Sequence, residues 1–271
     1  MQDVATNTWC GDAGAGERSD TQRTLIFHYH LFKNAGTSVD ELLRRNFGSR
    51  WVAQEFATAR RENAAAIAEF ITGNPQLQAM SSHTAHLPVP QLDGIEIFPI
   101  IFLRHPIDRL RSAYEFERRQ NASTAGARLA KAHDLAGYLR ELLKHPRNRQ
   151  VRNFQTYRLS LNEPKSRGTE LQRAQGALEN LPFVGVVEDF DESVRRLAEL
   201  LQPKFPDFKI WNAHRNTASG RDASLGRRLE SVNQTLGDDL YDELCKANQD
   251  DIELYDQLKA AMPRLQNSHR A

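Results

Sequence analysis

The stretch FHYHLFKNAGTSVDELLRRNFG, residues 27–48, contains the most informative junction in the chain. Its first half alternates apolar and polar residues as a strand does, and its second half repeats apolar residues at helical spacing. The junction itself reads KNAGTS, which places a lysine, a glycine and two hydroxyl side chains where the strand pattern becomes a helix pattern. We therefore expect a β-strand, a short loop and an α-helix in immediate succession.

The loop has the features of an anion-binding site. The first N–H groups of a helix have no partner within the helix and carry a partial positive charge, so a helix that follows a buried strand attracts anions. Gly36 lets the backbone approach a ligand closely, and Lys33 adds a full positive charge. Thr37 and Ser38 can cap the helix or donate to phosphate oxygens. A capped helix with a surface lysine is the alternative, and the lysine-before-glycine order disfavours a Walker A loop for ATP.

Strand and helix patterns alternate along the rest of the chain. Strands are predicted at 23–32, 77–83, 95–104 and 181–190, and helices at 37–47, 57–71, 107–119, around 133–145, at 192–201 and, as two or three helices, between 224 and 262. This alternation predicts an α/β fold with a central, mainly parallel β-sheet flanked by helices. We expect a single domain over 23–262, a flexible N-terminal lead at 1–22 and a C-terminal tail at 263–271.

The composition is that of a globular protein without a disulfide framework. The chain has 271 residues, of which 39% are hydrophobic and 26% charged, and its net charge is +1. A chain of this length can bury a core without covalent staples. The two cysteines, Cys10 and Cys245, lie near opposite ends, which indicates a reducing compartment. Because we find no signal-peptide pattern and no apolar run of about 20 residues, we expect a cytoplasmic protein.

Two segments resemble the phosphate-binding elements of the carbohydrate sulfotransferases of the Golgi and bacterial type. HLFKNAGTSVDELL is similar to that family's 5′-phosphosulfate loop, and FLRHPIDRLRSAYEF is similar to its 3′-phosphate element. Five more segments resemble segments of the family and occur in the family's order: TAHLPV, NFQTYRLS, FVGVVEDFDESVRRL, NAHRNTA and DDIELYDQL. The similarity covers roughly residues 24–260. It implies a P-loop-like fold and a sulfuryl donor, 3′-phosphoadenosine-5′-phosphosulfate (PAPS).

The resemblance also implies roles for individual residues. Lys33 corresponds to the lysine that contacts the 5′-phosphosulfate, and Arg104 and Ser112 correspond to the pair that binds the 3′-phosphate. The loop around the phosphosulfate corresponds to Asn34, Ala35, Gly36, Thr37 and Ser38. Two positions depart from the family pattern, because Phe32 replaces a proline and His105 replaces an acid. Neither departure removes a phosphate contact, but both could reshape the pocket.

Sulfuryl transfer resembles phosphoryl transfer in its demands. The group moves in line from the leaving oxygen to the acceptor oxygen, so positioning and electrostatics carry most of the catalysis. Lys33 would stabilise the charge on the leaving phosphate, and a base must take the acceptor proton. His86, which follows the predicted strand 77–83, is the preferred base and His83 is the reserve. Glu55 ranks below both, and His28 and His30 are interpreted as strand histidines. No metal is expected.

Positive charge gathers after the second phosphate element. Between Arg104 and Arg158, Lys and Arg outnumber Asp and Glu by 13 to 5. An anionic ligand or a solvated helical face would each account for this excess. A uronic acid, a sulfated glycan or a glycolipid headgroup would suit Arg118, Arg119, Arg147, Arg149 and Arg152. We therefore expect a carbohydrate acceptor, with anionic ones among the candidates. We expect no nucleic acid, because aromatic and basic residues do not interleave.

Two other classes of protein stay open on sequence grounds. A P-loop-type nucleotide kinase would bind ATP with magnesium, although the Walker A order is missing. A non-catalytic module for nucleotides or glycans would be insensitive to His86→Ala. The resemblance favours a PAPS-dependent carbohydrate sulfotransferase over both.

Overall fold

The computed structural model describes residues 23–57, 60–211 and 224–267. The predicted N-terminal lead and the NAHRNTA segment that begins at residue 212 lie outside the described residues. At the other end, helix α11 (Gln249–Asn267) continues past residue 262, where we expected the domain to end.

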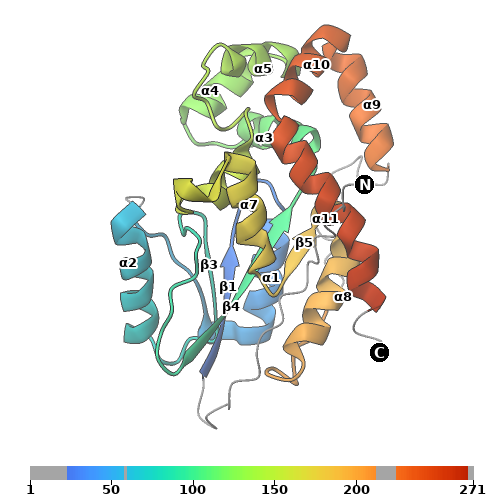
Figure 1. Ribbon diagram of the computed structural model, residues 1–271. Helices are drawn as coiled ribbons and strands as arrows, with labels where there is room; N and C mark the ends of the chain where they lie inside the picture. Colours follow the sequence, from blue (N-terminus) through green and yellow to red (C-terminus); the bar gives the residue numbers. More distant parts are fainter. Residues whose placement is uncertain (1–22, 58–59, 212–223, 268–271) are drawn as a thin grey trace.

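A five-stranded parallel sheet forms the centre of the described structure (Figure 1). The strands are β1 (Arg23–Tyr29), β2 (Trp51–Ala53), β3 (Ala79–Ser82), β4 (Ile95–Leu103) and β5 (Val184–Val186). Their order in the sheet is β2-β3-β1-β4-β5, and each named pair runs parallel. The short edge strand β2 was not predicted. β5 is shorter than expected because the chain turns into a 3₁₀-helix at Val187–Asp189.

Helices cover both faces of this sheet, which confirms the predicted α/β fold. Besides α11 they are α1 (Gly36–Phe47), α2 (Arg60–Gly73), α3 (Pro106–Arg119), α4 (Ala125–Ala132), α5 (Leu135–Leu143), α6 (Phe154–Ser160), α7 (Glu170–Glu179), α8 (Phe190–Leu201), α9 (Leu225–Leu236) and α10 (Asp238–Ala247). We did not predict α4, α6 or α7. Within the described ranges, no helix combines the length and apolarity needed to cross a bilayer.

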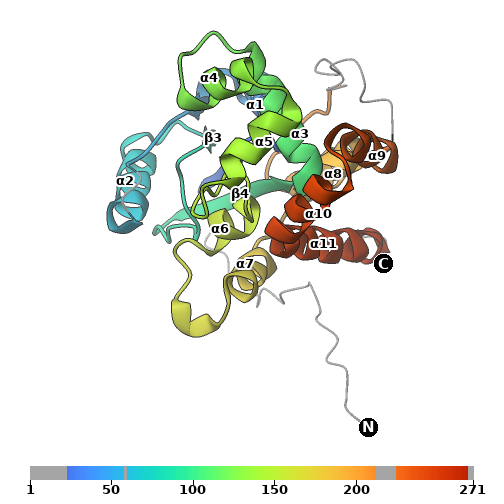
Figure 2. The same cartoon turned by 90° about the horizontal axis from the view of Figure 1, so that it is seen from above.

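The alternation of side chains along β1 divides the core. Leu25, Phe27 and Tyr29 belong to a cluster with α2, α6, α7 and α11, whereas Ile26 packs on the opposite face with α1 and α8. His28 lies two residues after Ile26 and therefore faces α1 as well. A further cluster joins α3, α5, α9 and α10, which lie beyond the carboxyl ends of the strands (Figures 1 and 2).

The strand order places the candidate site. β1 is flanked by β3 on one side and β4 on the other, so the chain changes direction across the sheet between these neighbours. In open parallel sheets, ligands bind at the carboxyl ends of the strands where the order reverses. The loop after β1 and the residues after β4 therefore meet at the edge where a ligand is expected.

Candidate functional site

The loop between β1 and α1 turns tightly. Lys33 and Ala35 have φ angles of 65° and 60°, which lie in the left-handed region that non-glycine residues rarely adopt. Such residues cost roughly 1–3 kcal/mol each and concentrate at ligand sites. The Asn34 N–H donates to the Leu31 carbonyl (3.1 Å), and the Ser38 N–H donates to the Ala35 carbonyl (2.9 Å). The loop thus brings the start of α1 to the carboxyl edge of the sheet.

Two side-chain amides fix this loop to β4. The buried Asn34 donates from Nδ2 to the Phe102 carbonyl and to Gln155 Oε1, both at 2.7 Å. Gln155, at the start of α6, also accepts from the Arg104 N–H (2.9 Å) and donates to the Arg104 carbonyl (2.8 Å). The NFQTYRLS segment that we matched by resemblance therefore joins the two predicted phosphate elements through Gln155.

Arg104 meets the loop directly. It follows β4 and is 8% exposed, and its Nη1 donates to the Lys33 carbonyl at 3.2 Å. Its Nε and Nη2 donate to Asp108 Oδ2 at 2.9 and 2.8 Å. Arg228 from α9 binds the same carboxylate at 3.0 and 3.1 Å. Burial would raise the pKa of Asp108, but the two guanidinium groups hold it below its usual value.

Asp108 and Arg228 are site residues that the sequence analysis missed. The spacing of four between Arg104, just before α3, and Asp108 in the first turn of that helix was an available signal for the aspartate. Arg228 lies 120 positions from Asp108, and no local pattern connects them. Ser112 lies one turn after Asp108 on α3 and is partly buried, so it shares the helix face that carries Asp108.

The remaining described family-like segments support this edge from behind. Glu188 accepts from the His105 N–H (3.0 Å) and from the Tyr255 hydroxyl (3.1 Å), and burial raises its pKa. Asp251 accepts from the N–H groups of Gln155 (3.0 Å) and Thr156 (2.7 Å) at the start of α6. Glu188 of FVGVVEDF and Asp251 of DDIELYDQL therefore bind backbone N–H groups of neighbouring segments, which gives each a structural role without contact to a ligand.

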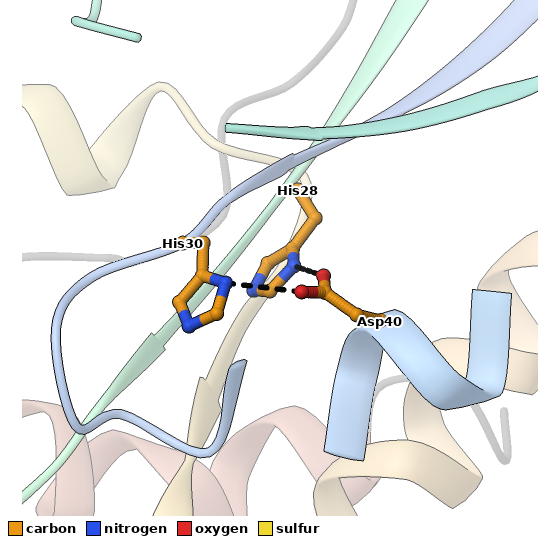
Figure 3. Close-up of side chains that lie close together, drawn as sticks. All are labelled: His28, His30 and Asp40. Atoms are coloured by element: carbon orange, nitrogen blue, oxygen red, sulfur yellow. Dashed lines mark hydrogen bonds and ion pairs between the residues drawn. The ribbon is translucent and has the colours of Figure 1, made fainter. Parts of the chain in front are cut away.

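A histidine pair lies against the other side of the loop (Figure 3). His28 Nδ1 is 2.8 Å from Asp40 Oδ1, and His30 Nδ1 is 3.1 Å from Asp40 Oδ2. Because a carboxylate only accepts, both rings carry their proton on Nδ1. Burial lowers the pKa of His28. Burial would raise the pKa of Asp40, but the histidine hydrogen bonds hold it far below its usual range.

The three side chains also form a group that could hold a metal ion, since their ligand atoms lie within 4.8 Å of one another. In the structure the carboxylate already takes one N–H from each ring. The expectation of no metal stays a prediction.

Gly36 packs directly on His30. A Cβ atom at position 36 would lie 1.7 Å from His30 Nε2. We predicted that this glycine allows a close approach of the ligand, and the structure adds a second reason, which is the imidazole beneath it.

The reserve base His83 lies beside the same imidazole. Its ring centroid is 3.8 Å from that of His30, and its side chain is about half exposed. Its Nδ1 is 2.7 Å from Glu55 Oε1, so Nε2 is the ring nitrogen that this carboxylate does not bind. Arg158 Nη2 donates to the His83 carbonyl (2.7 Å) and to the Ala85 carbonyl (3.1 Å), so α6 holds this loop in place. Sequence analysis ranked Glu55 low as a base, and in the structure its carboxylate binds the His83 imidazole.

The preferred base His86 is more deeply placed. It is 4% exposed, and its backbone N–H donates to Asn63 Oδ1 on α2 at 2.9 Å. The structure thus brings Lys33, the loop, Arg104 and His83 to one edge, with the His86 ring buried next to it.

Several arginines of the positive stretch are engaged within the protein. Arg119 pairs with Glu115 and Arg149 pairs with Glu170. Arg118 lies over the Tyr114 ring and Arg152 donates to the Leu143 carbonyl, whereas Arg147 is exposed. Arg109, which we did not single out, is fully buried, bonds to the Gln150 carbonyl and stacks on Phe154. Much of the charge excess therefore stabilises the fold.

Comparison with known proteins agrees with this geometry. A sequence profile described as the sulfotransferase family matches residues 20–256. An uncharacterized protein of Archaeoglobus fulgidus is 37% identical over 243 residues, which cover 87% of this chain and 96% of that protein. The profile match extends over both phosphate elements and over the segments that support them. The chain therefore belongs to the sulfotransferase family.

Proposed function

We propose that this protein transfers the sulfuryl group of PAPS to a hydroxyl of a carbohydrate. The observation that carries the proposal is the contact between the two phosphate elements, in which Arg104 Nη1 donates to the Lys33 carbonyl. One nucleotide with phosphates at both its 5′ and 3′ positions could span the start of α1 and the Arg104–Ser112 face of α3. The carbohydrate acceptor rests on the resemblance of the motifs.

The donor would be held by backbone and charge together. The first N–H groups of α1 would bind the 5′-phosphosulfate, with the hydroxyls of Thr37 and Ser38 beside them. Arg104 would bind the 3′-phosphate with an N–H group that Asp108 does not use. Ser112 would add a hydroxyl from the same face of α3.

The transfer needs one bond made and one broken. The acceptor oxygen attacks sulfur, the bond between sulfur and the 5′-phosphate oxygen breaks, and 3′-phosphoadenosine-5′-phosphate (PAP) leaves. Lys33, whose Nζ lies 4.5 Å from the centre of the Phe116 ring, would move to the leaving oxygen and stabilise its charge. The acceptor proton passes to a base.

We assign the base to His83 and keep His86 as the alternative. His83 is half exposed, and Glu55 binds its Nδ1, which orients Nε2 as the acceptor of a proton. His86 is buried, so the acceptor would reach it only after a rearrangement of the loop. Replacing each histidine by asparagine in turn distinguishes the two assignments of the base. His83→Asn should lower kcat at least about 100-fold, which is the usual contribution of a general base, and His86→Asn should lower it far less. The opposite ranking would return the role to His86.

The first experiment is calorimetric binding of PAP with ATP as the control. PAP binding at micromolar concentrations that ATP cannot match would support the two-phosphate site. Equal or tighter ATP binding would contradict it and favour a nucleotide kinase. Transfer of label from sulfur-labelled PAPS to glycans then tests the reaction. PAP binding without transfer to any glycan would indicate a non-catalytic module.

A further inference from the structure

A pocket of about 660 Å³ lies between α3, α4, α5 and the segment that follows α5. Pockets of roughly 300–1,000 Å³ are the size that takes small ligands. Phe32, which stands next to Lys33 in the donor loop, is part of its lining. The pocket therefore adjoins the place where the sulfuryl group would be presented.

An aromatic pair connects the pocket to the donor loop. Phe32 meets Phe116 edge to face, with ring centres 5.7 Å apart. Lys33 Nζ lies over the Phe116 ring. Phe32 is also the residue that replaces the proline of the family pattern. The substitution thus adds an aromatic ring to the wall between the donor lysine and the pocket.

Two carboxylates and one imidazole are the titratable groups of the pocket besides Tyr138. Glu117 and Glu141 belong to its lining, together with His145, Asn148 and Gln150, and no Lys or Arg occurs among the described residues that line it. The carboxylate of Glu117 is bound by the Gln120 amide and, at 3.3 Å, by the Thr124 hydroxyl, both of which are uncharged.

Glu117 also affects the floor of the pocket. Burial, together with the carboxylate of Glu117, raises the pKa of the lining residue Tyr138 to about 12. A Cβ atom on Gly126, another lining residue, would lie 2.8 Å from the Glu117 carboxyl carbon. The carboxylate is therefore packed into the wall of the pocket, next to whatever enters.

We propose that this pocket is the acceptor subsite and that it takes an uncharged sugar residue, a proposal that rests on the proposed function. The apolar C–H face of a pyranose would pack on Phe32 and the leucine side chains of the wall. Its hydroxyls would donate to the carboxylates of Glu117 and Glu141 and exchange hydrogen bonds with Asn148 and Gln150. A sugar carboxylate or sulfate would instead meet like charge.

The positive charges near the pocket do not cancel the negative charge of its lining. Lys144 pairs with Glu141 at 2.5 Å, which reduces but does not remove the charge of one wall. Arg109 lies behind the lining residue Gln150, where it is fully buried and bonded to the Gln150 carbonyl. Glu117 has neutral partners, so we expect it to contribute most to the exclusion of anions.

The test compares two acceptors that differ in one carboxylate. Sulfuryl transfer from labelled PAPS is measured for 4-nitrophenyl β-glucoside and 4-nitrophenyl β-glucuronide, with the full chain. We expect kcat/KM to favour the glucoside by at least about tenfold, because one like charge is repelled. Glu117→Gln should narrow this ratio at least threefold by raising kcat/KM for the glucuronide. Glu115→Gln is the matched control, because Glu115 lies on the same helix but pairs with Arg111 and Arg119 instead of lining the pocket.

PAP affinity, measured by calorimetry for each variant, separates the possible failures. A glucuronide turned over as well as the glucoside, or equal effects of the two glutamine variants, would overturn the pocket assignment. Turnover of neither glycoside by a protein that binds PAP would overturn it too. If the wild-type protein does not bind PAP, the proposed function is refuted and this inference with it.

Discussion

Gly36→Ala is the sharpest structural test of the site, because it adds one methyl group at a defined place. The new Cβ would lie 1.7–2.2 Å from three atoms of the His30 ring. Carbon atoms in contact normally sit about 3.5–4.0 Å from their neighbours, so the ring or the loop must move by about 1.5–2 Å. Gly36 is not among the described glycines with positive φ, so alanine can adopt its backbone conformation. The substitution therefore acts through the steric clash alone.

The cost follows from what holds the His30 ring. The ring lies between those of His28 and His83, at 5.1 and 3.8 Å, and its Nδ1 is bound to Asp40. Overpacking costs about 1–3 kcal/mol, and a lost hydrogen bond to a charged group costs about 1.5–3 kcal/mol. We expect Gly36→Ala to lower the free energy of unfolding by about 3 kcal/mol and to weaken PAP binding.

Urea unfolding and PAP calorimetry measure both effects, and a double-mutant cycle tests their cause. In a His30→Ala background the added methyl meets no ring, so Gly36→Ala should then cost less than about 1 kcal/mol. Gly176→Ala in α7 is the matched control, since its Cβ would have no atom within 4 Å, and it should be neutral or stabilising by up to about 1 kcal/mol. An equal cost of Gly36→Ala in the presence and absence of the imidazole would refute the reasoning.

The other predictions concern charge, pH and metal. Lys33→Ala should lower kcat about 10²–10³-fold, because the positive charge that stabilises the leaving phosphate oxygen is lost; near-wild-type turnover in steady-state kinetics would contradict that role. Arg104→Ala should weaken PAP binding by about ten- to a hundredfold, because a charge-assisted hydrogen bond is lost; unchanged calorimetric affinity would exclude the assignment. Because the folded-state pKa of Asp40 is depressed, its stabilisation is present above the unfolded-state pKa and is lost as pH falls through the folded-state value. Urea midpoints should therefore fall less between pH 7 and pH 3 for Asp40→Asn than for the wild type, and an equal fall would show that this carboxylate is not the acid-sensitive group. Activity should survive EDTA, and a loss that zinc restores would instead assign a metal to the His28–His30–Asp40 group.

Local sequence carried much of the fold. The strand-to-helix junction, the helices around 37–47, 107–119 and 192–201, and the helices at the end of the chain all follow from side-chain periods and caps. Among the elements that were not predicted, β2 and α6 are short. β2 has three residues and α6 has seven, and such segments depend on pairing or on packing against distant chain. α6 starts where Asp251 accepts the backbone N–H groups of Gln155 and Thr156, which is a contact across about 95 positions.

The two proposed phosphate elements could be recognised in the sequence because each is a contiguous pattern, with its lysine or arginine placed by a strand end and a helix start. How they meet was not, because the contacts are long-range. Gln155 joins Asn34 to Arg104, and Asp108 joins Arg104 to Arg228, across separations of up to 121 positions that no local period records. The choice among the histidines likewise depends on burial, since His83 and His86 stand three residues apart in one loop and only packing exposes one and covers the other. Chain-local chemistry thus predicted which groups could bind a nucleotide, and tertiary packing specified which of them share one edge and which charges already have partners within the protein.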